Sequence, residues 1–329
     1  MHKILQKALS ISLRIGISII LLVILFYFKE IDINNLLDHI RSANKPLLLL
    51  AFSFVFLNYI LCFFRWNMLL KAANIKLPIK RVAISFCGGI FFSLLLPSSI
   101  GGDFARSIDL ARHTQKTKEV IATVLMDRLS GYIGLVIIAL FSCVLGWKIV
   151  NNDIAVLASV AIITSILIFI LLILFNQFLY TKVNKFLLTP NSGRIRKSIQ
   201  NLLQEIYYFR DKKGVLLESL VLSLIVQANG PIAFYITALA LGVSGVSLLY
   251  FFIFVPIIGA ITLLPIAIGG FGIRESTSVF LFAKAGIDGI VATAIALLNS
   301  YFILIFGVIG GIIYVFTLHY RRIQHSASP

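Results

Sequence analysis

Cysteine, histidine and acidic side chains are scarce in this chain, and each scarcity excludes a class of protein. The 329 residues include three cysteines, five histidines, and 13 aspartates and glutamates together. The cysteines lie in or beside apolar segments without paired spacing, so we expect buried thiols and neither disulfides nor metal ligands. The histidines are scattered, and the sequence contains no ATP-binding motif and no multi-acid metal motif. We therefore predict no metal, no other cofactor and no catalytic residue.

Long polar stretches are missing as well. Hydrophobic residues make up 59% of the chain and its mean hydropathy is +1.00, well above the apolar content of soluble domains. The longest stretch without a membrane-length apolar run is 181–213, too short for a separate soluble catalytic domain. No small-residue cleavage site follows the first apolar run, so we expect an uncleaved first span. The sequence predicts one all-α polytopic membrane domain, 1–329.

Eight apolar runs divide this domain. Six of them are long enough to cross a bilayer, at 13–28, 47–64, 120–147, 154–180, 214–241 and 290–318. The other two, 82–97 and 248–264, end at Leu-Pro pairs. As a helix, 82–97 would measure about 24 Å, less than the hydrocarbon core of roughly 30 Å. We therefore predict about six full spans and two re-entrant hairpins.

Each Leu-Pro pair introduces the same motif, Pro-x-x-x-Gly-Gly-x-x-x-Arg. It runs from Pro97 to Arg106 and again from Pro265 to Arg274. A helix breaker and a glycine pair indicate that the backbone leaves helical form within the membrane, which is tolerated only against protein or a water-filled cavity. In transporters, paired interruptions in matching positions of two halves indicate a binding site.

The positions of lysine and arginine predict the topology. With both termini in the cytoplasm and each hairpin returning to its own side, most basic residues lie inside, as the positive-inside rule requires. Segments 13–147 and 154–318 then repeat one order of elements in opposite orientations, an inverted-topology repeat. The basic loop 181–213 is cytoplasmic in this topology. Its part 194–213 is either an amphipathic helix that attracts anionic lipid or a solvated linker, and 34–40 would be its shorter outer counterpart.

The two glycine-arginine motifs supply the main candidate site. Glycine lacks a Cβ and turns the chain tightly, and a helix starting just after each pair would direct its N–H groups and positive dipole end into the membrane. One turn later, a guanidinium completes a receptor for phosphate. The alternative is that the glycines allow close helix packing and the arginines snorkel. The candidate residues are Gly101, Gly102, Arg106, Gly269, Gly270 and Arg274.

Four further charged residues fall at membrane depth, where charges are rare and usually paired or hydrated. Asp103 and Glu275 lie in the motifs; each is expected to pair with an arginine or to line water, as a structural ion pair or in proton coupling. Asp127 and Arg128 are adjacent in the run 120–147. Because neighbours on a helix point about 100° apart, each is expected to meet another segment, either in a polar cavity or as a contact between helices.

Other polar residues receive structural interpretations. Arg65 and Trp66 follow the second apolar run, and we interpret them as an interfacial anchor. Gln227, Asn229 and Pro231 fall in the middle of 214–241. There the proline removes a backbone hydrogen bond and the amides satisfy freed groups or contact substrate.

These motifs together resemble the flippase-like transmembrane domain of lysylphosphatidylglycerol synthases, and stand-alone proteins that share it. The resemblance covers about residues 10–318. It rests on Arg65-Trp66, Leu96-Pro97, Gly101-Gly102-Asp103, Arg106, Asp127-Arg128, Gly131, Leu264-Pro265, Gly269-Gly270, Gly272 and Arg274-Glu275. It implies an integral membrane protein that handles a charged lipid. The soluble aminoacyl-transfer domain of those synthases is not found in this sequence, so lipid synthesis is not implied.

We therefore expect a non-enzymatic translocator in the inner membrane. Its substrate would be a phosphate-bearing or otherwise charged lipid, or a polyprenyl-linked glycolipid of envelope or glycan biogenesis. The alternatives are a membrane-embedded transferase acting on a polyprenyl-linked substrate, and a non-catalytic membrane partner of a glycosyltransferase or lipid synthase. No nucleic-acid partner is expected.

Overall fold

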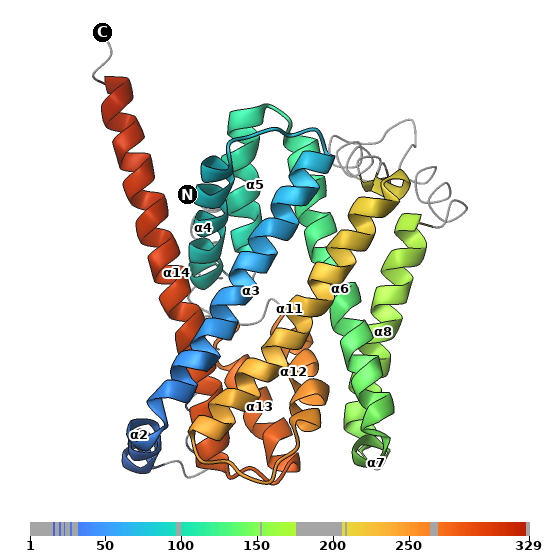
Figure 1. Ribbon diagram of the computed structural model, residues 1–329, viewed down its shortest axis with the longest axis vertical. Helices are drawn as coiled ribbons and strands as arrows, with labels where there is room; N and C mark the ends of the chain where they lie inside the picture. Colours follow the sequence, from blue (N-terminus) through green and yellow to red (C-terminus); the bar gives the residue numbers. More distant parts are fainter. Residues whose placement is uncertain are drawn as a thin grey trace. The chain divides into compact units, whose positions relative to one another are not determined.

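Every segment of regular structure in the described part of the chain is helical (Figure 1). The computed structural model describes residues 32–96, 100–151, 153–175, 206–207, 209–263 and 269–326, with the isolated residues 16, 20, 23 and 27. Helices of membrane length and apolarity are α3 (Lys45–Ala72), α6 (Thr117–Leu145), α8 (Ile154–Phe175), α11 (Lys213–Ala240) and α14 (Gly289–Ser326). This confirms an all-α polytopic membrane protein.

These five helices correspond to five of the six predicted spans. The sixth, 13–28, lies largely outside the described residues, as does the basic segment 181–205. A short amphipathic helix, α2 (Ile33–Ser42), covers the predicted helical segment 34–40. It begins where the Asp32 carboxylate accepts a hydrogen bond from the Asn34 N–H, 2.9 Å away, which satisfies one of the unpaired donors at a helix start.

The two shorter apolar runs form the first arms of the predicted hairpins. They are α4 (Ile79–Leu95) and α12 (Leu248–Thr262), followed by α5 (Ile100–Thr114) and α13 (Ile273–Lys284). The prolines at 97 and 265 lie outside the described residues. At both motifs, therefore, one short helix ends and a second short helix begins.

The glycines serve these two breaks in different ways. α13 begins after its glycine pair, as predicted, and Gly269, Gly270 and Gly272 have φ angles of 58°, 77° and 86°, a region that L-residues rarely adopt. The expectation that α5 also begins after its pair is wrong, because α5 begins at Ile100. There, a Cβ on Gly102 would lie 2.1 Å from the Gly89 carbonyl oxygen. The first pair thus allows α5 to pack closely on α4, which is the alternative role considered for it.

The described chain forms two compact units. One comprises Met1–Tyr59, Ala83–Arg106 and Ala228–Pro329, and the other comprises Ile60–Val82 and Ser107–Gln227. Helices α3, α4, α5 and α11 contribute residues to both. Each unit thus combines segments from both predicted repeats, 13–147 and 154–318, and the repeat itself stays a prediction.

In the first unit, α13 packs between α12 and α14, and α2 packs on α14 (Figure 1). A second contact joins α4 to α14 through glycine. A Cβ on Gly310 would lie 2.9 Å from the Cys87 carbonyl oxygen, and one on Gly307 would lie 2.1 Å from a methyl carbon of Leu94. Glycine at such positions lets two membrane helices approach closely. The first arm of the first hairpin is therefore held tightly against α14.

In the second unit, α6 packs on α8 and on the short α7 (Trp147–Val150). Half of the apolar span of α6 is buried, whereas most of the corresponding stretch of α8 is exposed. Because α8 is apolar on nearly all sides, its outer surface suits contact with lipid. Helix α6 is the central helix of this unit, and it contains Asp127 and Arg128.

Candidate functional site

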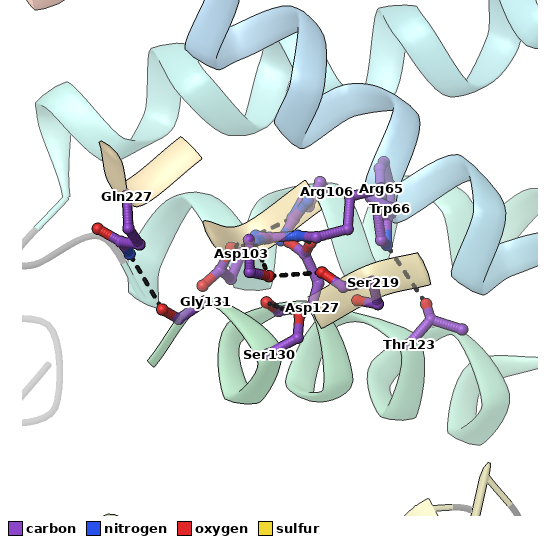
Figure 2. Close-up of polar contacts among 11 residues, drawn as sticks. Arg65, Trp66, Asp103, Arg106, Thr123, Asp127, Ser130, Gly131, Ser219 and Gln227 are labelled. Carbon is purple, nitrogen blue, oxygen red and sulfur yellow. Dashed lines mark hydrogen bonds and ion pairs between the residues drawn. The ribbon is translucent and has the colours of Figure 1, made fainter. Parts of the chain in front are cut away.

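A buried ion pair joins α3 to α6 in the second unit (Figure 2). The Arg65 Nε donates to the Asp127 Oδ1 over 2.7 Å, and the Arg65 Nη1 donates to the Ser223 hydroxyl of α11 over 2.8 Å. The Arg65 and Asp127 side chains are only 6% and 5% exposed. A charge at such a position is tolerated only when it is paired and hydrogen-bonded. One arginine therefore ties three helices together.

Further hydrogen bonds surround this pair (Figure 2). The Trp66 indole N–H donates to the Thr123 hydroxyl over 3.3 Å, and the Gln227 amide donates to the Gly131 carbonyl over 3.0 Å. Gly131 also leaves room for the guanidinium, because a Cβ there would lie 3.5 Å from the Arg65 Nη1. These polar contacts among α3, α6 and α11 lie next to one another along α6, and we call the set the Arg65 network (Arg65, Trp66, Thr123, Asp127, Gly131, Ser223 and Gln227).

The interpretation of Arg65 and Trp66 as an interfacial anchor is wrong. Helix α3 continues to Ala72, and both side chains are buried. Asp127 does meet another segment, as expected, and its partner is Arg65. Ser223 was not identified from the sequence, because a serine in an apolar helix carries no signal of its partner. Arg128 is half-buried, and the substrate-binding roles of Asp127 and Arg128 stay predictions.

In the first unit, Arg106 and Asp103 form an ion pair one turn apart on α5. The distance from the Arg106 Nη2 to the Asp103 Oδ1 is 2.9 Å, and both side chains are largely buried. The Arg106 guanidinium also lies 5.8 Å from the centre of the Phe86 ring. Close to it, a Cβ on Gly89 would be 3.1 Å from the Arg106 Cβ. The expected pairing of Asp103 with an arginine is confirmed, and it compensates the charge of Arg106.

The second motif has different electrostatics. The Arg274 Nη1 donates to the Ser300 hydroxyl over 3.2 Å, and its Nη2 donates to the Gly269 carbonyl over 3.3 Å. The fully buried Glu275 accepts from the Gly272 N–H over 2.6 Å and from the Ser300 hydroxyl. Glu275 therefore caps the start of α13, and its expected pairing with an arginine is not found among the described residues. In the same part of the chain, Arg274 has no carboxylate within ion-pair distance.

The two motifs approach each other within the first unit. A Cβ on Gly269 would lie 3.4 Å from the carbonyl oxygen of Leu94, near the end of α4. The turn that carries Arg274 thus reaches the end of the first arm of the first hairpin. The substrate-binding roles of Gly101, Gly102, Gly269 and Gly270 stay predictions, since the structure accounts for these glycines by packing and backbone geometry.

The chain is similar to known membrane proteins over most of its length. The sequence model of the lysylphosphatidylglycerol synthase TM region matches residues 11–311. The UPF0104 membrane protein PH1989 of Pyrococcus horikoshii is 23% identical over 307 residues, which cover 87% of this chain and 91% of that protein. Both matches extend over the Arg65 network and both glycine-arginine motifs.

Proposed function

Because this chain belongs to the lysylphosphatidylglycerol synthase transmembrane-region family, we propose that it translocates a phosphate-bearing lipid across the membrane. The substrate would be a charged phospholipid or a polyprenyl-linked glycolipid, and the protein itself would not change it chemically. We place the protein in the inner membrane with both termini in the cytoplasm, following the distribution of basic residues.

The observation that carries this proposal is that Arg274 has no direct carboxylate partner among the described residues. Its two hydrogen bonds go to a hydroxyl and a carbonyl, and a guanidinium has five N–H donors. Both direct partners are uncharged, and the buried Glu275 carboxylate is reached only through the shared Ser300 hydroxyl, so the guanidinium keeps donors and part of its positive charge for an anion. Guanidinium binds phosphate through two parallel hydrogen bonds and with a charge-assisted gain. Arg274 therefore has the chemistry of a phosphate receptor at a helix break.

Arg106 has a different role in this proposal. Asp103 already neutralises it, so a phosphate there would compete with a bound carboxylate. We assign the phosphate to Arg274 and treat Arg106 as a residue that joins α5 to α4, since its guanidinium lies over the Phe86 ring and its carbonyl accepts from the Ser85 hydroxyl. The two motifs share a sequence pattern, but among the described residues a carboxylate lies within ion-pair distance of Arg106 and none does of Arg274.

Charge neutralisation explains why such a residue would help a lipid cross. A headgroup phosphate is costly to move through hydrocarbon, and so is an isolated arginine. When the two bind, the net charge at that depth falls to about zero while the lipid tails stay in the bilayer. The positive-φ turn at Gly269 and Gly270 places the guanidinium where the backbone itself is not helical, the kind of position at which transporters bind substrate.

Liposomes that contain only this protein would test the proposal. A labelled phosphate lipid is placed in one leaflet, an impermeant reagent reports its arrival in the other, and mass spectrometry examines the lipid afterwards. Movement of an unchanged lipid supports a translocator. A new covalent lipid product would contradict it and favour a transferase. Movement that occurs only after a glycosyltransferase is added would also contradict it, in favour of a partner protein.

A further inference from the structure

A cavity of about 430 Å³ lies in the second unit, at the C-terminal end of α3. Five of its six lining residues come from the last turns of α3 and one from the start of α11: Phe64, Asn67, Met68, Lys71, Ala72 and Val215. The volume falls within the range of small-molecule sites. The Arg65 network and the glycine-arginine motifs contribute no residue to this lining.

The lining residues divide into an apolar and a polar column. Residues four apart lie one above the other on a helix, so Phe64 and Met68 form one column and Asn67 and Lys71 form the next. Val215 of α11 adds to the apolar wall. A cavity with hydrocarbon on one side and an amide and an ammonium on the other suits an amphipathic ligand.

The Asn67 side chain is the second observation that points to a ligand. The residue is more than nine-tenths buried and lines the cavity, yet no hydrogen bond of its amide is found in the described part of the chain. Its amide atoms are not among the fully buried unpaired polar atoms of the described residues, so they reach the space of the cavity. A ligand that offers an oxygen and a hydroxyl would satisfy both halves of this amide.

Two lysines lie near the polar end of the cavity. Lys71 is exposed at its mouth, and the Lys212 ammonium donates a hydrogen bond to the Ala72 carbonyl. Glu218 lies three residues after Val215 on α11 but does not line the cavity. The electrostatics therefore favour an anion over a cation.

From these features we propose that this cavity binds the phosphate-bearing headgroup of an anionic glycerophospholipid. Lys71 would contact the phosphate, the Asn67 amide would contact the glycerol hydroxyl or ester oxygens, and the first carbons of the chains would lie against Phe64 and Met68. The cavity is at the end of a membrane-length helix, where headgroups are found in a bilayer. This site is separate from the phosphate receptor assigned to Arg274.

Native mass spectrometry of the full-length protein tests the proposal, with phosphatidylglycerol as the probe and phosphatidylcholine as the neutral comparison. Lys71→Ala and the charge reversal Lys71→Glu should each weaken retention of phosphatidylglycerol about tenfold, the usual size of one charge-assisted hydrogen bond. Asn67→Leu, which keeps the side-chain size, should weaken it as well. The matched control is Lys76→Ala, an exposed lysine beyond the end of α3, and it should bind like the wild type.

Two results would overturn the proposal. One is equal retention of phosphatidylglycerol by the wild type and both Lys71 variants. The other is displacement of the lipid by an equal concentration of glycerol phosphate, which would show that the site takes a free phosphate ester and not a lipid. Arg274→Ala serves as an internal comparison. It should retain phosphatidylglycerol at this cavity even where it abolishes translocation.

Discussion

The guanidinium of Arg65 in α3 and the carboxylate of Asp127 in α6 form a buried ion pair, with 2.7 Å between the Arg65 Nε and the Asp127 Oδ1. The two residues are 62 positions apart in the chain. A buried pair of this kind contributes little net stability compared with well-packed apolar residues, but removal of one partner leaves an uncompensated charge. The pair therefore fixes which faces of the two helices meet.

Breaking this pair should be far more costly than breaking a surface pair. Asp127→Ala is expected to destabilise the protein by about 3–5 kcal/mol, because Arg65 would stay buried without its carboxylate. The measurement is the free energy of unfolding in detergent. Asp38→Ala is the control, since the Asp38–Arg41 pair has side chains 73% and 75% exposed and should contribute less than about 1 kcal/mol. Equal losses in the two variants would contradict the burial of the pair.

Because α5 packs closely on α4, adding one methyl group at Gly102 should strongly reduce the stability of the protein. Gly102→Ala places a Cβ 1.9 Å from the Ser93 hydroxyl oxygen and 2.1 Å from the Gly89 carbonyl oxygen. Backbone must then move, at a typical cost of about 1–3 kcal/mol or more. Gly214→Ala is the matched control, because a Cβ there has no atom within 4 Å. Thermal unfolding should separate the two variants, and similar midpoints would mean that the α4–α5 contact is looser than described.

At Gly270 the steric cost and the backbone cost of adding a side chain can be measured separately. Gly270→Ala meets both a positive φ of 77° and a contact of 2.3 Å with the Thr262 Cγ2. Adding Thr262→Ser removes that methyl group but keeps the hydroxyl that donates to the Ile258 carbonyl. The double variant should recover the steric part of the lost stability and keep a backbone cost of about 1–2 kcal/mol. Full recovery would show that the φ angle carries no strain for alanine.

The predicted opposite orientation of the hairpins can be examined by cysteine labelling. In a variant without the three native cysteines, Arg112→Cys and Lys284→Cys place single thiols at the exposed ends of α5 and α13. An impermeant thiol reagent should reach them from opposite faces of the membrane. Labelling of both from one face would refute the inverted repeat.

The sequence was sufficient to predict the helical class, five of the spans and both interruptions between helices, because hydropathy and helix breakers are local signals. It did not reveal the position of Arg65. A hydropathy profile ends a span at the first charge, so the span was predicted to end at residue 64. Helix α3 instead continues to Ala72, and its buried Arg65 is compensated by a carboxylate in α6. That partnership is tertiary, and nothing near Arg65 in the sequence indicates it.

The two glycine pairs illustrate the same limit. Both pairs lie in the same sequence pattern, and this pattern is compatible with either role, a turn of the chain or close packing of helices. Which role applies depends on the neighbours: Gly102 lies against the backbone of α4, whereas Gly269 and Gly270 adopt positive φ angles. The ion pairing of Arg106 and Arg274 differs for a comparable reason. Asp103 lies one turn from Arg106 and pairs with it, whereas Glu275 caps a helix.

The rate of lipid movement in liposomes containing Arg274→Ala tests the central claim most directly. We expect this variant to lose translocation of a phosphate lipid by at least about tenfold, the effect of one charge-assisted contact. Arg274→Lys should be intermediate, because lysine keeps the charge without the two parallel donors. The exposed Arg41→Ala should match the wild type. Undiminished movement in properly inserted Arg274→Ala would contradict the assignment of the phosphate to this residue.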